Sequence, residues 1–401
     1  SKLKELQKYI FEVEEYKSLD YDCADAFYAK TNDNWGGGCS AISKMVDGHR
    51  LVGRNMDQSI SNKCAYIIRT NAMRLQINAG KYKTLGLAYT HRDYSPDYDD
   101  IKKNGISDEL YKVLPFMCDD VLNSGGLHIE INMRHGEYWP NGEDKYACEG
   151  TNKKSKDRVY MFELPRYIGE NCATVEEAKK YVSKLDVYSQ DHYWNYCFII
   201  SDSTGHSSLL EFSSNEVHWL DEDKLDSYDW LKKYNTKAIA QANFYLNKTA
   251  WITQDIKTGE GRFIALQNGI DAVKSRNDMY NLMKKVQYSS YYLDYDECKN
   301  EHFDPRSENL GEISWAVYEL IMHPEFEDTA RKYTNEANEE VRSLSRKEKQ
   351  DINKYWESIF TEVVDVNTKE IFVRIYENEN SLYLINFDGT KKLNSIDDWK
   401  N

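Results

Sequence analysis

The stretch "DNWGGGCSAISK" at residues 33–44 constrains the fold most, because three glycines lead directly into a cysteine and a strand-like segment. The next residues, "CSAISKMV", "DGH" and "RLVGRNMD", predict two strands joined by a tight Asp-Gly turn. Such a hairpin brings Arg54 and Asp57 back beside Cys39. The alternative is a flexible linker before a buried cysteine, and the glycines taken alone favour that alternative.

Composition narrows the class of protein. The chain has 401 residues, enough for one large domain or two ordinary ones, and no domain boundary is evident after residue 39. A net charge of −15 argues against nucleic-acid partners and anionic membrane surfaces. No window approaches the roughly 20 apolar residues of a membrane span. No signal peptide is visible, but a chain that starts at Ser1 gives little information on compartment; the cytoplasm is slightly favoured over export.

The reactive side chains match few known motifs. The eight cysteines are far apart and contain no C-x-x-C, so neither a zinc site nor a small disulfide scaffold is predicted. Most of these cysteines are expected to be buried thiols. The nine histidines are dispersed, and the chain lacks H-E-x-x-H, Walker, dinucleotide-binding and G-x-S-x-G motifs. The histidines are therefore expected to be surface or core residues and not metal ligands.

The periodicity of the remaining segments predicts an α+β class with layered sheets and helices. Residues 1–30 have helical spacing, with Leu3, Leu6, Ile10 and Val13 on one face. This helix is either an ordinary surface helix or a prosegment that covers a site. The other expected helices are 174–186, 262–286 and the highly charged block 325–362. The other expected strands lie in 119–134 (a turn with Gly125 and Gly126 that leads into an alternating strand), 196–220 (a hairpin around residues 203–205), 236–246, 370–377 and 381–387.

Cys39 is the strongest candidate nucleophile, and it needs a base. No histidine is near it in sequence, but a free α-amine with a pKa of about 7.7–8.0 can act as that base. Cys39 would gain such an amine if an N-to-S shift and hydrolysis broke the bond from Gly38. Arg54 would stabilise the thiolate, and Asp57 would hold the amine in place.

At this point a resemblance extends the prediction. "GCSAI" followed by "GRNMD" resembles the choloylglycine hydrolase family, which comprises bile salt hydrolases and penicillin V acylases. Further motifs follow in the family's order over residues 39–387: "DDVLNSGGLHIEIN", "ISDSTGHSSLLEF", "QANFYL", "GRFIALQNGI", "ISWAVYEL" and "FVRIYENENSLYLINF". The resemblance implies an N-terminal nucleophile hydrolase with a four-layer αββα sandwich.

Transferred position by position, the resemblance assigns the site residues. The resemblance implies that Cys39 is the nucleophile and that its free amine is the base, with Arg54 and Asp57 on either side of it. The Asn243 side chain and the Asn132 main-chain N–H would hold the oxyanion. Arg262 would order the pocket. The chain departs from the family pattern between Leu127 and Asn132, where the spacing is one residue short.

The implied activity is hydrolysis of a linear C–N amide bond through a Cys39 thioester, with no metal or organic cofactor. The expected partner is a small N-acyl amide with a hydrophobic acyl group; bile-salt, penicillin V and fatty-acyl types stay open. An acyltransferase or esterase on the same fold, and an uncleaved non-catalytic binding protein, are the alternatives.

Residues 1–38 would be a prosegment released by self-cleavage of a zymogen, and residues 39–401 would be the hydrolase domain. Its charged insertion, about 325–362, is a solvated appendage or a contact in a homo-oligomer.

Overall fold

The fold is described from a computed structural model. It covers residues 3–7, 10–13, 38–59, 65–70, 80–89, 103–105, 107, 114–134, 146–189, 195–254, 257, 259–287, 324–329, 331–332, 356–375 and 382–400. The expected segments 14–30 and 333–355 and the motif "ISWAVYEL" lie outside these residues.

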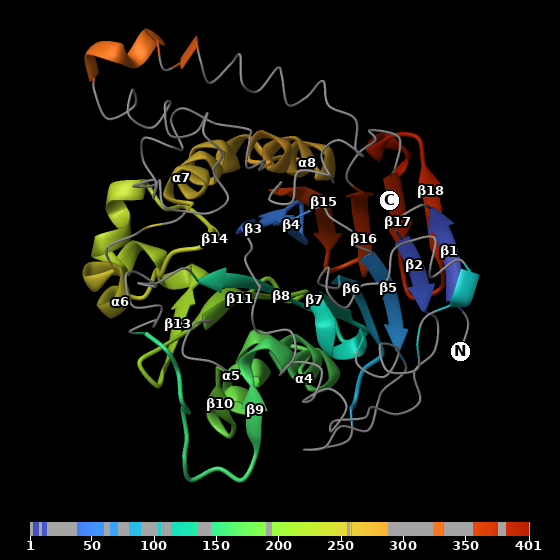
Figure 1. Cartoon of the computed structure of the whole chain (residues 1–401), viewed down its shortest axis with the longest axis horizontal. Helices are drawn as coiled ribbons and strands as arrows, with labels where there is room; N and C mark the ends of the chain where they lie inside the picture. Colours follow the sequence, from blue (N-terminus) through green and yellow to red (C-terminus); the bar gives the residue numbers. More distant parts are fainter. Residues whose placement is uncertain are drawn as a thin grey trace.

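Two large sheets lie face to face, with helices on both outer sides (Figure 1). The nine-stranded sheet contains, in spatial order, β1 (Leu3–Gln7), β2 (Ile10–Val13), β5 (Ala65–Thr70), β6 (Thr84–Tyr89), β7 (Cys118–Asn123), β8 (Leu127–Arg134), β11 (Asn195–Asp202), β12 (Ser207–Ser213) and β13 (Glu216–Asp221). The seven-stranded sheet contains β14 (Ile239–Gln241), β3 (Gly38–Val46), β4 (His49–Ser59), β15 (Trp356–Asp365), β16 (Glu370–Ile375), β17 (Leu382–Ile385) and β18 (Thr390–Leu393). A small parallel pair joins β9 (Arg158–Tyr160) to β10 (Asp186–Tyr188).

The helices complete the outer layers. The α-helices are α4 (Leu164–Asn171), α5 (Val175–Ser183), α6 (Lys248–Thr253), α7 (Glu260–Gly269) and α8 (Arg276–Lys285), and the 3-10 helices are η1 (Leu114–Met117), η2 (Met161–Glu163), η3 (Glu222–Ser227), η4 (Asp229–Tyr234), η5 (Ile270–Ala272), η6 (Pro324–Phe326) and η7 (Ile396–Asp398). Helices α4 and α5 cover the nine-stranded sheet, and α7 and α8 cover the seven-stranded sheet (Figure 1). The predicted α+β class with four αββα layers is confirmed.

The hairpin that carries Cys39 is also confirmed. Asp47 and Gly48 at its turn have φ values of 48° and 80°, the left-handed pair that a two-residue hairpin turn requires. The register pairs Cys39 with Met56 and Gly38 with Asp57. Cys39 therefore lies beside the end of β4, as predicted.

Several other predicted elements are present. Thr174 caps α5 by accepting from the Glu177 main-chain N–H, and β11 turns into β12 at Gly205, whose φ is 104°. Helices α7 and α8 occupy most of the predicted segment 262–286. The strand expected over 236–246 is shorter, since only Ile239–Gln241 pairs with β3.

Two helix predictions are wrong where the structure describes them. Residues 3–7 and 10–13 are strands, because β2 pairs in parallel with β5 and β1 pairs with β2 at the sheet edge. This pairing, together with the β-favouring side chains of 10–13, outweighs the helical spacing. The end of the charged block, from Trp356, is strand β15, because β4 and β16 hydrogen-bond to its two edges.

The two sides of β8 differ in chemistry. Leu127, Ile129, Ile131 and Met133 pack into the apolar core under α4 and α5. The alternate side chains point toward the seven-stranded sheet, and with one residue of β7 they form what we call the polar strip: Asp120, His128, Glu130, Asn132 and Arg134, all buried. The described residues contain no helix long and apolar enough to cross a membrane.

Candidate active site

Cys39 begins the central hairpin of the seven-stranded sheet, and its side chain is buried between the sheets, with 4% of the residue exposed. Its Sγ lies 3.5 Å from Met56 Sδ, since the register places Met56 opposite. Val52, Leu87 and Phe360 belong to the same apolar cluster. The thiol is therefore held in an apolar environment.

The main chain of Cys39 is held by two residues from distant parts of the sequence. Its N–H donates to Asn243 Oδ1 at 3.1 Å, and its carbonyl oxygen accepts from Arg262 Nη1 at 3.0 Å. Arg262 Nη2 also donates to Asn243 Oδ1 at 3.0 Å. Asn243 follows β14 and Arg262 lies in the first turn of α7, so the fold brings three separate segments together at the main chain of Cys39.

Arg262 is itself positioned by the fold. Asp57 Oδ2 lies 3.5 Å from Arg262 Nη1, and Asp57 Oδ1 accepts a hydrogen bond from Ser358 Oγ. Gly259, at the start of α7, has a φ of 83°, and a Cβ there would lie 2.7 Å from Arg262 Nη2. Both the positive φ and the close guanidinium therefore require a glycine at position 259, directly before α7.

Arg54 is buried and ion-paired on the inner side. Its Nε lies 3.2 Å from Glu130 Oε2, and its Nη2 donates to the Ile131 carbonyl at 2.7 Å. Burial is the largest single influence and lowers the pKa of Arg54, but the negative charges around it, led by Glu130, together raise it more, so the net direction is upward. Arg54 therefore stays cationic close to Cys39.

The thiol of Cys39 is protonated in the continuous chain. Burial raises its pKa to about 12, against which the charge of Arg54 acts only in part. At neutral pH, five units below that pKa, only roughly one thiol in 10⁵ is ionised. The side chain needs a nearby base before it can act as a nucleophile.

The two asparagines expected at the oxyanion occupy different positions. Asn243 Nδ2 donates to the Met133 carbonyl at 2.8 Å. Asn132 lies in the polar strip and pairs with Cys197 across the β8–β11 ladder; with its amide oriented so that both oxygen and nitrogen are satisfied, Nδ2 donates to Glu130 Oε2 at 3.0 Å and to the Ile131 carbonyl at 2.9 Å. Among the described residues, no hydrogen bond joins the Asn132 side chain to Cys39.

Sequence reasoning missed four residues that support the site: Met56, Glu130, Gly259 and Ser358. Glu130 had a signal, because "HIEINMR" is polar at every second position, which marks a polar face of the strand. Ser358 had none, because it falls in the block predicted to be helical. The partners of Arg54 and Asp57 thus follow from strand pairing over long sequence distances.

Comparison with known proteins gives one family. Residues 39–225 match the linear amide C–N hydrolases, choloylglycine hydrolase family. Among solved structures, a mutant of the conjugated bile acid hydrolase from Clostridium perfringens is similar with 16% identity and a TM-score of 0.47, covering 88% of this chain and 96% of that one. Penicillin V acylase from Agrobacterium tumefaciens is similar with 11% identity and a TM-score of 0.46, covering 87% and 86%. No curated protein matches the chain significantly.

Proposed function

We propose that Cys39 is the N-terminal nucleophile of this chain, whose residues 39–225 belong to the choloylglycine hydrolase family of linear amide C–N hydrolases. The substrate would be an N-acyl amide, and the acyl group would pass through a thioester on Cys39. The enzyme would become active by cutting itself between Gly38 and Cys39.

The proposed self-cleavage has two steps. Cys39 Sγ attacks the Gly38 carbonyl carbon, a C–S bond forms, the C–N bond breaks, and the thiol proton ends on the released nitrogen. Water then hydrolyses the thioester, which leaves a carboxylate on Gly38 and a free amine and thiol on Cys39. The raised pKa of the thiol means that this amine supplies the missing base.

Amide hydrolysis would use the same atoms. The amine of Cys39 takes the thiol proton, sulfur attacks the substrate carbonyl, and the leaving amine departs with a proton. Water completes the cycle by hydrolysing the acyl thioester. We assign Arg54 to thiolate stabilisation, Asp57 and Arg262 to positioning, and the Asn243 side chain with the Asn132 main-chain N–H to the oxyanion.

The observation that carries this proposal is the convergence of Asn243 and Arg262 on the main chain of Cys39. The nitrogen that accepts the proton in self-cleavage is the atom that donates to Asn243 Oδ1 at 3.1 Å. The same contact would hold the free amine beside its own thiol afterwards. Arg262 and Asn243 also hydrogen-bond to each other, so the two segments form one polar arrangement around the Cys39 main chain.

The substrate proposal follows from the surroundings of the thiol. Met56, Leu87 and Phe360 belong to the apolar cluster that contains Cys39. An acyl group attacked by this sulfur would be adjacent to apolar side chains, which favours a hydrophobic acyl group. Bile-salt, phenoxyacetyl and fatty-acyl amides are the classes to test.

Intact mass spectrometry and a panel of these amides test the proposal. We expect wild type to yield separate masses for residues 1–38 and 39–401 and to hydrolyse at least one class. Cys39→Ala should remain uncut and inactive, whereas Cys172→Ala, which removes another buried thiol, should be cut and active. Amidase activity in Cys39→Ala, or in a verified uncut wild type, would disprove the mechanism. Hydroxylamine trapping would separate hydrolysis from acyl transfer.

A further inference from the structure

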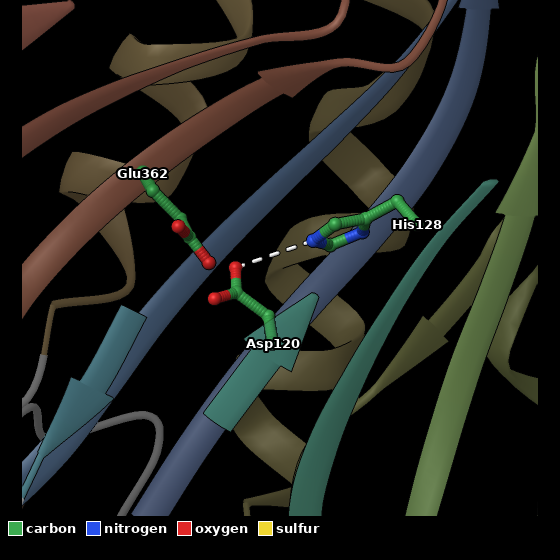
Figure 2. A group of neighbouring side chains, drawn as sticks. All are labelled: Asp120, His128 and Glu362. Atoms are coloured by element: carbon green, nitrogen blue, oxygen red, sulfur yellow. Dashed lines mark hydrogen bonds and ion pairs between the residues drawn. The ribbon is translucent and has the colours of Figure 1, made fainter. Parts of the chain in front are cut away.

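A second cluster of polar side chains lies between the sheets, outside the Cys39 site. Asp120 and His128 extend from β7 and β8, and Glu362 extends from β15 of the opposite sheet (Figure 2). One donor atom from each of these residues lies within 4.8 Å of the other two, and all three residues are fully buried. Asp120 Oδ2 lies 3.2 Å from His128 Nε2.

Glu362 has little to compensate its burial. Neither of its carboxylate oxygens accepts from an N–H or hydroxyl donor among the described residues, and the side chain that hydrogen-bonds to it is another carboxyl group, that of Asp120. The nearest cation, Arg54, has its Nη1 at 3.9 Å, while its Nε pairs with Glu130 at 3.2 Å. A buried carboxylate without such a donor is strongly destabilising, so this group points to a missing occupant.

The charges around the cluster do not balance. The buried carboxyl groups of Asp119, Asp120, Glu130 and Glu362 face a single guanidinium group, that of Arg54. A divalent cation would offset part of this excess of carboxyl groups. The other buried pair nearby, Arg134 with Glu211 at 2.8 Å, is already balanced.

We propose that Asp120, His128 and Glu362 bind one divalent transition-metal ion, with Zn²⁺ the best match, between the two sheets. Two carboxylates and an imidazole suit Zn²⁺ better than Mg²⁺ or Ca²⁺, which prefer oxygen ligands. Tetrahedral Zn²⁺ places its ligand atoms about 3.3 Å apart, close to the Asp120–His128 separation.

The main rival occupant is a proton. Burial and the charge of Asp120 raise the pKa of Glu362 well above its usual value, so Glu362 would hold a proton if no ion were bound. A shared proton explains one contact between two carboxyl groups. His128 is held beside them by its own hydrogen bond to Asp120, so metal analysis is the measurement that separates the two occupants.

The position of the ion assigns it a structural role. Its ligands come from both sheets, so it would link the two inner layers much as a cross-link does. Another histidine–carboxylate pair, His49 with Asp365, lies within the seven-stranded sheet and does not link the two sheets, so it serves as a control. His49 Nδ1 lies 2.8 Å from Asp365 Oδ2, but the same oxygen also binds Arg276 at 2.7 Å, so this pair has a cation already.

Metal analysis in a Cys39→Ala background tests the proposal, because that background removes the thiol as a competing ligand. The protein is stripped with EDTA, dialysed against Zn²⁺ with a weak chelator, and measured by elemental mass spectrometry. We expect about one Zn²⁺ per chain and a rise in Tm of roughly 5 °C over the stripped protein. Adding Glu362→Gln should lower the Zn²⁺ content below about 0.2 per chain, whereas adding His49→Gln should leave it unchanged.

A parent chain that binds no Zn²⁺ and has an unchanged Tm would overturn the proposal in favour of the shared proton. Unchanged Zn²⁺ content in the Glu362→Gln protein would also overturn it, because the ion would then lie elsewhere. If Glu362→Gln fails to fold, Co²⁺ in the parent gives an independent readout. Visible d–d absorption of a four- or five-coordinate ion supports the site, and its absence refutes it.

Discussion

The two faces of strand β8 are formed by alternate residues, but one face is apolar and the other is polar and charged. Ile129 and Ile131 pack outward into an apolar core under α4 and α5. His128 and Glu130 point inward, where Glu130 pairs with Arg54 and His128 contacts Asp120. Burying ions costs free energy that apolar side chains would not cost, so the Arg54–Glu130 pair on the inner side is poorly explained by stability. The difference indicates that the outer side maintains the fold and the inner side arranges charge near Cys39.

The strongest test of this comparison removes charge from the inner side. Arg54→Met should lower kcat/KM by about 10³-fold, because the thiolate of Cys39 loses its nearest cation. It should also destabilise the protein by about 3–5 kcal/mol, because Glu130 is left as a buried unpaired charge. Kinetics on the cleaved protein and urea unfolding measure the two effects.

The double variant Arg54→Met with Glu130→Gln is the matched control. Removing both charges should restore most of the stability while activity stays low. Recovery of activity together with stability would mean that Arg54 supports only the fold, and the comparison would fail.

The outer side should respond in the opposite way. Ile129→Ala creates a cavity in the apolar core and should cost about 2–5 kcal/mol of unfolding free energy. The kcat/KM of the folded fraction should stay within about twofold of wild type, since no charge near Cys39 changes. A large loss of activity at full folding would show that the two sides are not separable.

A thiol on the outer side gives a smaller, pH-dependent test. Burial raises the pKa of the Cys172 thiol to about 12, from an ordinary value of 9.0. The unfolded state loses this proton above pH 9 while the folded state keeps it, so the contribution is fully present below pH 9 and is lost as pH rises toward 12. The unfolding free energy of wild type should therefore fall relative to Cys172→Ala by about 1 kcal/mol between pH 9 and 10. Parallel pH profiles of the two proteins would show that the folded thiol is not protected from ionisation.

Local sequence patterns predicted much of this arrangement. The Asp-Gly turn and the alternation around Cys39 predicted the hairpin and its neighbours Arg54 and Asp57, because register follows from the turn. The resemblance placed Asn243 and Arg262, which the structure brings to the Cys39 main chain. Glu362 and Ser358 could not be predicted, because β15 is a strand only through its pairing with β4 and β16. The strands at residues 3–13 depend likewise on the edge that β5 offers.

Strands β1 and β2 also have a consequence for handling the protein. They cover the edge of β5, and an uncovered strand edge is a template for pairing with other chains. If residues 1–38 are cut from the rest of the chain, β1 and β2 can dissociate, and the edge of β5 then becomes free to pair with other molecules. A preparation that loses β1 and β2 should become prone to forming cross-β aggregates during storage, even when the Cys39 end of the molecule is intact.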